Sequence, residues 1–154
     1  MSQQWIDGQT LAEHLMSADM NHIRGVTFQI PKLGMPVPSL YPHQEEALTH
    51  LMARPVSTIL HLPTGSGKTR IALELISRVL QEHPETKVVW ASYPTTLIRQ
   101  SMARLAQFSL NLPEDLRFCW AKSDAQSRNV PDLITDHEVI FVLRGTLTGL
   151  LRDV

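Results

Sequence analysis

The sequence predicts an α/β protein in which a parallel β-sheet is covered by helices on both faces. Short apolar runs of strand-like composition alternate along the chain with amphipathic stretches of helical periodicity. A glycine-rich stretch, LPTGSGKTR at residues 62–70, lies between one such run and one such helix. The length of 154 residues and the apolar fraction of 43% are typical of one globular domain with a sizeable core.

Residues 1–40 are expected to form a short leader before the main domain, residues 41–154. Thr10 and Glu13 have the spacing of a capping box, which predicts a helix there, and residues 25–30 predict a strand. Prolines and a glycine between residues 31 and 42 exclude a regular helix and mark the boundary. We expect this leader to be an accessory layer or a docking segment for protein partners.

The main domain is expected to alternate between helices and strands. The expected helices cover residues 43–53, 68–83 and 96–108, and the expected strands cover residues 57–62, 87–92, 116–121 and 138–143. The helix after the glycine-rich stretch repeats its apolar residues at a spacing of four, from Ile71 to Leu75 and Val79. This order predicts parallel strands joined by crossover helices.

Charge and cysteine content exclude several classes of protein. The net charge of -1 gives no overall field for a polyanion, so any nucleic-acid contact is expected to be local. The single cysteine, Cys119, cannot form an internal disulfide, and the histidines lack metal-ligand spacing. The N-terminus lacks a secretion signal, and no apolar run approaches the ~20 residues that span a membrane. A cytoplasmic location without membrane contact is expected.

The stretch TGSGKTR has the features of a phosphate-binding P-loop. Gly65 and Gly67 allow the backbone to approach an anion closely, Lys68 reaches the phosphates, and the Thr69 hydroxyl binds Mg²⁺. Lys68 and Thr69 are also the expected catalytic groups. The expected cofactor contacts are Thr64, Gly65, Ser66, Gly67, Lys68, Thr69 and Arg70. Leu62 stands where the usual pattern has its first glycine.

Three stretches, YPHQEEAL, PTGSGKT and VVWASYPTTLIRQ, occur in the order found in superfamily 2 helicases and translocases, and the chain resembles that superfamily over residues 41–151. The resemblance implies the first, P-loop RecA-like domain, with ATP and Mg²⁺ as cofactors and nucleic-acid backbone as the track, DNA more than RNA. It also implies that Gln44 reads the adenine edge and that Tyr41 lies near the base. A carboxamide offers the donor and acceptor that adenine requires.

The resemblance also implies a nucleic-acid contact at the corner after residues 87–92. Its candidate residues are Pro94, Thr95, Thr96, Arg99 and Gln100. A helix beginning at this corner, capped by Thr95 or Thr96, would bind phosphate without reading sequence. The alternative is that Thr95 is only a cap and Arg99 and Gln100 only a solvated face. A later stretch with Arg144 and Thr146 loosely resembles further backbone-contacting motifs, and all these loops are expected at one rim of the sheet.

Two features of the superfamily are not found in this sequence. No strand ends in the Asp-Glu pair that activates water, and no second RecA-like domain supplies arginines. We therefore expect an incomplete domain, the N-terminal part of a longer helicase, that hydrolyses ATP poorly by itself. A P-loop nucleotide kinase, or a non-catalytic nucleotide-binding or docking module, remains as an alternative.

Overall fold

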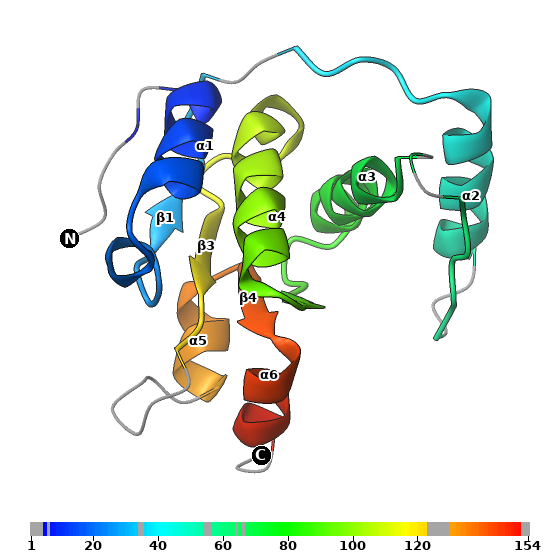
Figure 1. Cartoon of the computed structure of the whole chain (residues 1–154). Helices are drawn as coiled ribbons and strands as arrows, with labels where there is room; N and C mark the ends of the chain where they lie inside the picture. The colour runs from blue at the N-terminus through cyan, green and yellow to red at the C-terminus, as the bar shows by residue number, and fades with distance from the viewer. Residues whose placement is uncertain are drawn as a thin grey trace.

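The computed structural model describes residues 5, 7–33, 36–53, 57–63, 65, 67–122 and 130–151. They form a sheet with helices on both of its faces (Figure 1). The strands are β1 (Phe28–Gln29), β2 (Val88–Ser92), β3 (Arg117–Trp120) and β4 (Val139–Leu143), in the order β1-β3-β4-β2. Strand β4 pairs in parallel with β2 and β3, and β1 pairs antiparallel with β3. The predicted fold class is therefore confirmed.

The helices account for most of the remaining described residues. They are α1 (Gly8–Ser17), α2 (Pro42–Ala53), α3 (Lys68–Glu82), α4 (Thr95–Gln107), α5 (Val130–Asp136) and α6 (Arg144–Leu151). Two short 3₁₀ turns, Met20–His22 and Ser109–Asn111, follow α1 and α4.

Alternate residues of β3 and β4 point to opposite faces of the sheet, as strand geometry requires. Phe118 and Phe141 face one side and pack in a core with α1, α3 and α4. Cys119 and Ile140 face the other side, together with Leu133 of α5 and Leu147 of α6. Both faces of β3 and β4 are thus buried, which explains why these strands read as continuous apolar runs.

Residues 7–33 are part of the same sheet and core. Helix α1 packs against α4, and β1 forms an edge of the sheet. The N-cap of α1 is Asp7, whose carboxylate accepts the Thr10 N–H at 2.7 Å, so the predicted Thr10–Glu13 capping box is replaced by a cap three residues earlier. This hydrogen bond also lowers the pKa of Asp7. A functional division at residue 40 stays a prediction.

The strand predicted at residues 57–62 is absent from the described structure. This segment lies beside α2, away from the sheet (Figure 1), and Ile59 is 94% exposed. Whether a β-branched run forms a strand depends on a neighbouring strand that pairs with its backbone and on the burial of one of its faces. No described strand pairs with this run, so its β-branched composition alone did not produce a strand.

No helix within the described ranges combines the length and the apolar character needed to cross a bilayer.

Candidate functional site

The glycine-rich stretch forms a turn at the N-terminus of α3. Gly65 and Gly67 have φ angles of +83° and +81°, a left-handed conformation that glycine adopts without strain. Gly67 is the N-cap of α3, and no side chain hydrogen-bonds to cap this helix. The first N–H groups of α3 therefore form a candidate anion site. The predicted contacts Thr64 and Ser66 lie outside the described residues.

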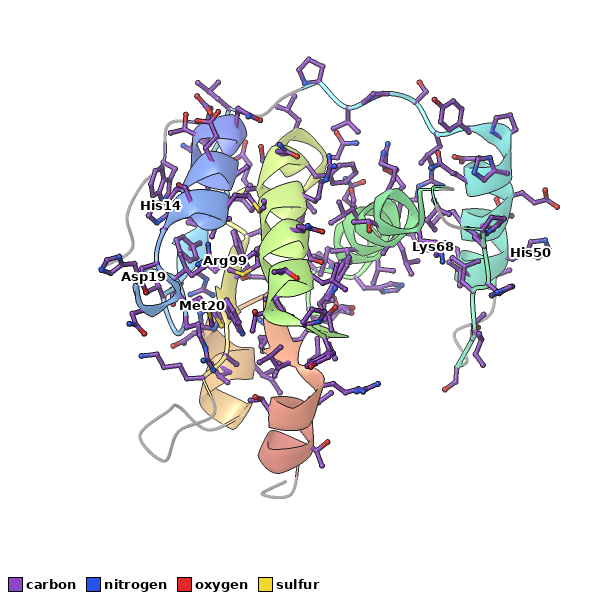
Figure 2. The ribbon with its side chains drawn as sticks, viewed as in Figure 1. His14, Asp19, Met20, His50, Lys68 and Arg99 are labelled. Atoms are coloured by element: carbon purple, nitrogen blue, oxygen red, sulfur yellow. The ribbon has the colours of Figure 1, made fainter. Side chains whose placement is uncertain are left out.

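Lys68 and Thr69 occupy the first turn of α3, and both are exposed. Figure 2 shows Lys68 at the end of α3 that faces α2. Within the described part of the chain, neither side chain makes a hydrogen bond or an ion pair. This arrangement leaves the ammonium and hydroxyl groups accessible to a phosphate.

Few protein groups at this site could bind Mg²⁺ directly. Thr69 offers one hydroxyl oxygen, and the described residues contain no group of three or more His, Cys, Asp or Glu side chains able to hold a metal. Mg²⁺ prefers oxygen ligands and usually keeps several waters, with one or two protein ligands beside substrate phosphates. The donor present therefore fits a metal that is bound mainly through a nucleotide.

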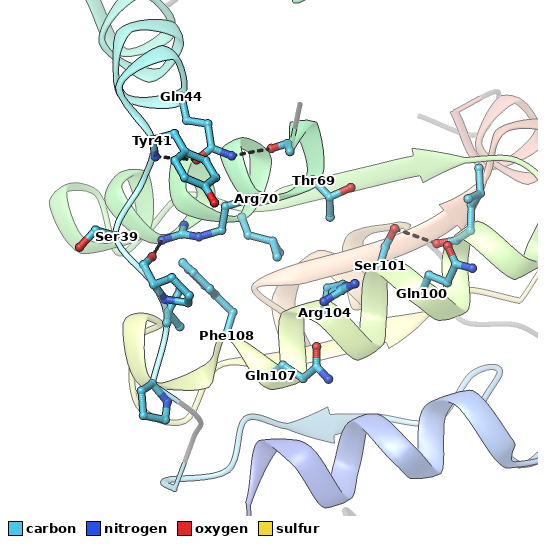
Figure 3. A pocket seen from close by; sticks show the side chains of 16 residues that line it. Ser39, Tyr41, Gln44, Thr69, Arg70, Gln100, Ser101, Arg104, Gln107 and Phe108 are labelled. Atoms are coloured by element: carbon cyan, nitrogen blue, oxygen red, sulfur yellow. Dashed lines mark hydrogen bonds between the residues drawn. The ribbon is translucent and has the colours of Figure 1, made fainter. Parts of the chain in front are cut away.

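Gln44 lies next to the turn and is only 4% exposed. Its Oε1 accepts the Tyr41 N–H at 2.8 Å, and its Nε2 donates to the Gly67 carbonyl at 3.5 Å (Figure 3). Tyr41 is largely exposed and stacks on His43, with ring centroids 6.0 Å apart. The structure thus brings both predicted base contacts close to the glycine-rich turn, with the Gln44 carboxamide bonded to main chain.

A cavity of about 780 Å³ opens beside the turn, between α3, α4 and residues 36–41, which we call the proline strap (Figure 3). Its volume is in the range of small-molecule sites. The strap contributes Pro36, Val37, Pro38, Ser39 and Tyr41; α2, the turn and α3 contribute Gln44, Gly67, Thr69, Arg70 and Leu73; α4 and its end contribute Leu97, Gln100, Ser101, Arg104, Gln107 and Phe108.

Arg70, a predicted cofactor contact, is held by three groups of the protein. Its guanidinium pairs with Glu74 at 2.7 Å, donates to the Pro38 carbonyl at 3.0 Å, and lies 4.8 Å from the ring centroid of Phe108. The structure therefore places Arg70 in the wall of the cavity, bonded to the strap.

Helix α4 begins at the corner after β2, one residue earlier than predicted. Pro94 is the N-cap, and no side chain caps the helix, so the prediction that Thr95 or Thr96 is the cap is wrong. These threonines are the first two helical residues, whereas a side-chain cap comes from the residue before them. Pro94 and Thr96 are exposed, and Thr95 is partly buried.

Arg99 does not lie in the open at this corner. It donates to the carbonyls of Leu15, Met16 and Ala18 at the C-terminal end of α1, and Figure 2 shows it beside that helix. Gln100, its neighbour, is exposed and lines the cavity. Arg99 therefore contacts α1, whereas Gln100 faces the cavity.

Two of the three loops that were predicted to share one rim of the sheet lie beside each other there. Ser92 and Leu143 are paired in register, which places the corner beside the start of α6, where Arg144 is exposed and Thr146 is partly buried. The third predicted loop, the glycine-rich turn, does not follow a strand that is paired in the described sheet. It meets α4 across the cavity instead, where Thr69 and Gln100 both lie.

Several cavity residues were not predicted from the sequence. Leu97, Ser101, Arg104 and Gln107 of α4, with Phe108 directly after it, recur at intervals of three or four and so share one face of the helix. Gln100 lies on the same face and was predicted only as a nucleic-acid contact. That spacing is visible in the sequence. Which face of α4 lines a cavity depends on the path of the proline strap, which periodicity does not contain.

Comparison with known families gives one finding. The family model described as type III restriction enzyme, res subunit, matches residues 38–151. No curated protein and no solved structure matches this chain.

Proposed function

The chain belongs to the family of the type III restriction enzyme res subunit, and we propose that it is an ATP-binding part of an ATP-dependent nucleic-acid helicase or translocase. The family is helicase-like, which confirms the predicted relation to superfamily 2. The observation that carries the proposal is the uncapped N-terminus of α3, with two left-handed glycines and the accessible Lys68, beside a cavity of nucleotide size.

The phosphates of ATP would bind at this helix N-terminus. The N–H groups of the first turn and the Lys68 ammonium favour negative charge, and the Thr69 hydroxyl would hold the Mg²⁺ of the nucleotide. A Mg²⁺ ion held in this way would supply positive charge that neutralises the phosphates. We propose Lys68 and Thr69 as the groups of this chain that act on the phosphates.

The base would lie toward Tyr41 and Gln44. Tyr41 presents an exposed ring at the edge of the cavity, suited to cover a purine. The Gln44 carboxamide is occupied by main-chain groups, so reading adenine would require it to exchange the Gly67 carbonyl for the base. Its long 3.5 Å bond to that carbonyl is the weaker of the two and supports such an exchange.

Nucleic acid would contact the corner of Pro94, Thr95 and Thr96 and the adjacent start of α6, with Arg144 and Thr146. Helix N–H groups and hydroxyls bind backbone phosphate without base specificity. Arg99 is bonded to α1, so it supports this surface through helix packing. A restriction-enzyme family favours DNA over RNA as the track.

Calorimetry with ATP and Mg²⁺ tests the proposal. Lys68→Ala should weaken binding by about 2 to 4 kcal/mol, because a charge-assisted contact to phosphate is lost. Lys87→Ala is the matched control, since Lys87 precedes β2 at the end of the strand opposite the corner, and it should bind as wild type does. Equal affinity of wild type and Lys68→Ala would refute phosphate binding by the loop.

A further inference from the structure

We propose that Arg70 is a positioning residue, which fixes the proline strap relative to the phosphate loop and thereby sets the affinity for the nucleoside part of ATP. The inference rests on the proposed function, because that function assigns phosphates to the loop and the base to the strap side of the cavity.

The place of Arg70 in the chain makes this role possible. It directly follows Thr69 in the first turn of α3, so its backbone is fixed to the phosphate loop. Its side chain is 23% exposed and points into the wall of the cavity, toward the strap (Figure 3). A residue with this placement connects the two halves of the site without itself contacting phosphate.

Three contacts from three elements fix the guanidinium. Glu74 of α3 binds Nη1 at 2.7 Å, the Pro38 carbonyl of the strap accepts from Nη2 at 3.0 Å, and the Phe108 ring at the end of α4 lies 4.8 Å from the guanidinium carbon. The planar fork of arginine can serve all three at once, whereas the single ammonium of lysine cannot.

The carboxylate that orients Arg70 is itself held. Glu74 is only 14% exposed and also accepts from Arg78 at 3.2 Å. Arg78 in turn binds Glu45 of α2 at 3.0 Å, and this hydrogen bond raises the pKa of Arg78. Glu45 follows Gln44 in sequence, so the network joins α2, α3 and the strap around one side of the cavity.

Two side chains hydrogen-bond to the strap, and its Val37 packs against the main core. Arg70 holds it at the Pro38 carbonyl, and Gln44 holds it at the Tyr41 N–H. Removing the Arg70 contact releases the strap near Pro38, so residues 36–39 should cover the nucleoside side of the cavity less closely, while Gln44 still holds Tyr41. Lys68, Thr69 and the N–H groups of α3 remain in place, so phosphate binding should be retained.

Two probes separate these effects in calorimetry on the whole chain: Mg²⁺ with ATP, and Mg²⁺ with inorganic tripolyphosphate, which has no nucleoside. Arg70→Ala should weaken ATP binding about tenfold, the loss of one charge-assisted contact, and change tripolyphosphate binding by less than about twofold. Arg70→Lys should show nearly the same loss for ATP. Arg117→Ala, which removes a paired arginine of β3, is the control and should bind both probes normally.

Phe108→Leu provides a second variant, because it removes the ring beside Arg70 and leaves an apolar side chain at this buried position. It should reproduce part of the ATP loss, and it carries the test if Arg70→Ala does not fold. Equal losses for both probes, or normal ATP binding by Arg70→Lys, would overturn the inference. Wild type that binds neither probe would refute the proposed function itself, and the inference with it.

Discussion

Gly65 and Gly67 of the glycine-rich turn have the same backbone conformation and different surroundings. A Cβ added to Gly65 would meet no atom within 4 Å, whereas a Cβ on Gly67 would lie 2.2 Å from Nε2 of Gln44. Both residues have positive φ angles, at which any L-residue is strained. A comparison of the two positions therefore separates the backbone strain from the contact with Gln44.

Alanine at either position should lower the free energy of unfolding, and Gly67→Ala should lower it more. The left-handed backbone costs about 1–2 kcal/mol in each variant. At Gly67 the buried Gln44 carboxamide must also leave its main-chain partners, which adds about 1–3 kcal/mol. Urea unfolding of the two variants measures this difference. Equal destabilisation would show that the Gln44 contact contributes nothing to stability.

At the residue scale, the sequence predicted residues within local patterns better than it predicted contacts between residues far apart in the chain. Gly65, Gly67, Lys68 and Thr69 lie within five consecutive positions, so the loop pattern was sufficient to place them at a helix N-terminus. Gln44 contacts the loop across 23 positions of sequence, and only the family resemblance pointed to it. The contacts of Arg70 with Pro38 and Phe108 had no sequence signal, because they depend on the path of the strap.

Helix α4 shows how an element can give a residue a role different from its predicted one. Arg99 is adjacent in sequence to the corner proposed to bind nucleic acid. Its guanidinium instead satisfies carbonyls at the end of α1, more than 80 positions away. Carbonyls in the last turn of a helix have no partner within the helix, so an arginine there stabilises both elements.

Arg99→Ala should therefore lower the free energy of unfolding by about 1.5–3 kcal/mol, the range for hydrogen bonds to a charged group. Arg104→Ala is the matched control. Arg104 is an exposed arginine of the same helix without a hydrogen bond or ion pair among the described residues, and its loss should change stability by less than about 0.5 kcal/mol. Urea unfolding measures both. An Arg99→Ala variant of normal stability that no longer binds nucleic acid would restore the direct-contact interpretation.

Element boundaries followed local signals closely. Helices α2, α3 and α4 and strands β2, β3 and β4 lie within one residue of their predicted ends, because periodicity and flanking breakers are local. Helix α5 was not predicted, since seven residues give too little periodicity. Residues 57–62 were predicted as a strand and join no strand of the described sheet, because strand pairing depends on a neighbour that composition does not reveal.

On the scale of the whole molecule, the candidate site forms where the helices meet, and the sheet rim carries the proposed nucleic-acid surface. Helix α3 contributes Leu73, Ile76 and Leu80 to the main core, which holds the glycine-rich turn near α4 although no strand of the described sheet precedes it. The cavity therefore depends on side-chain packing and on the Arg70 and Arg78 networks. This explains why the sequence predicted the glycine-rich turn before α3 and not the cavity beside it.

The chain is expected to bind ATP and to release phosphate from it very slowly. Phosphoryl transfer needs a group that orients the attacking water and a cation that meets charge on the γ-phosphate, and loss of one such arginine alone slows transfer by about 10³ to 10⁵. None of the described residues lining the cavity is Asp or Glu, and Arg70 is already paired with Glu74. Binding and turnover should therefore be separable in this chain.

Phosphate release at saturating ATP, with and without single-stranded DNA, measures this turnover. Wild type should match Lys68→Ala, which removes the phosphate contact and reports any contaminating ATPase. Rapid release by wild type that disappears in Lys68→Ala would contradict the expectation. It would mean that a catalytic carboxylate acts from outside the described cavity wall, and Asp→Asn and Glu→Gln substitutions in the remaining chain would then locate it.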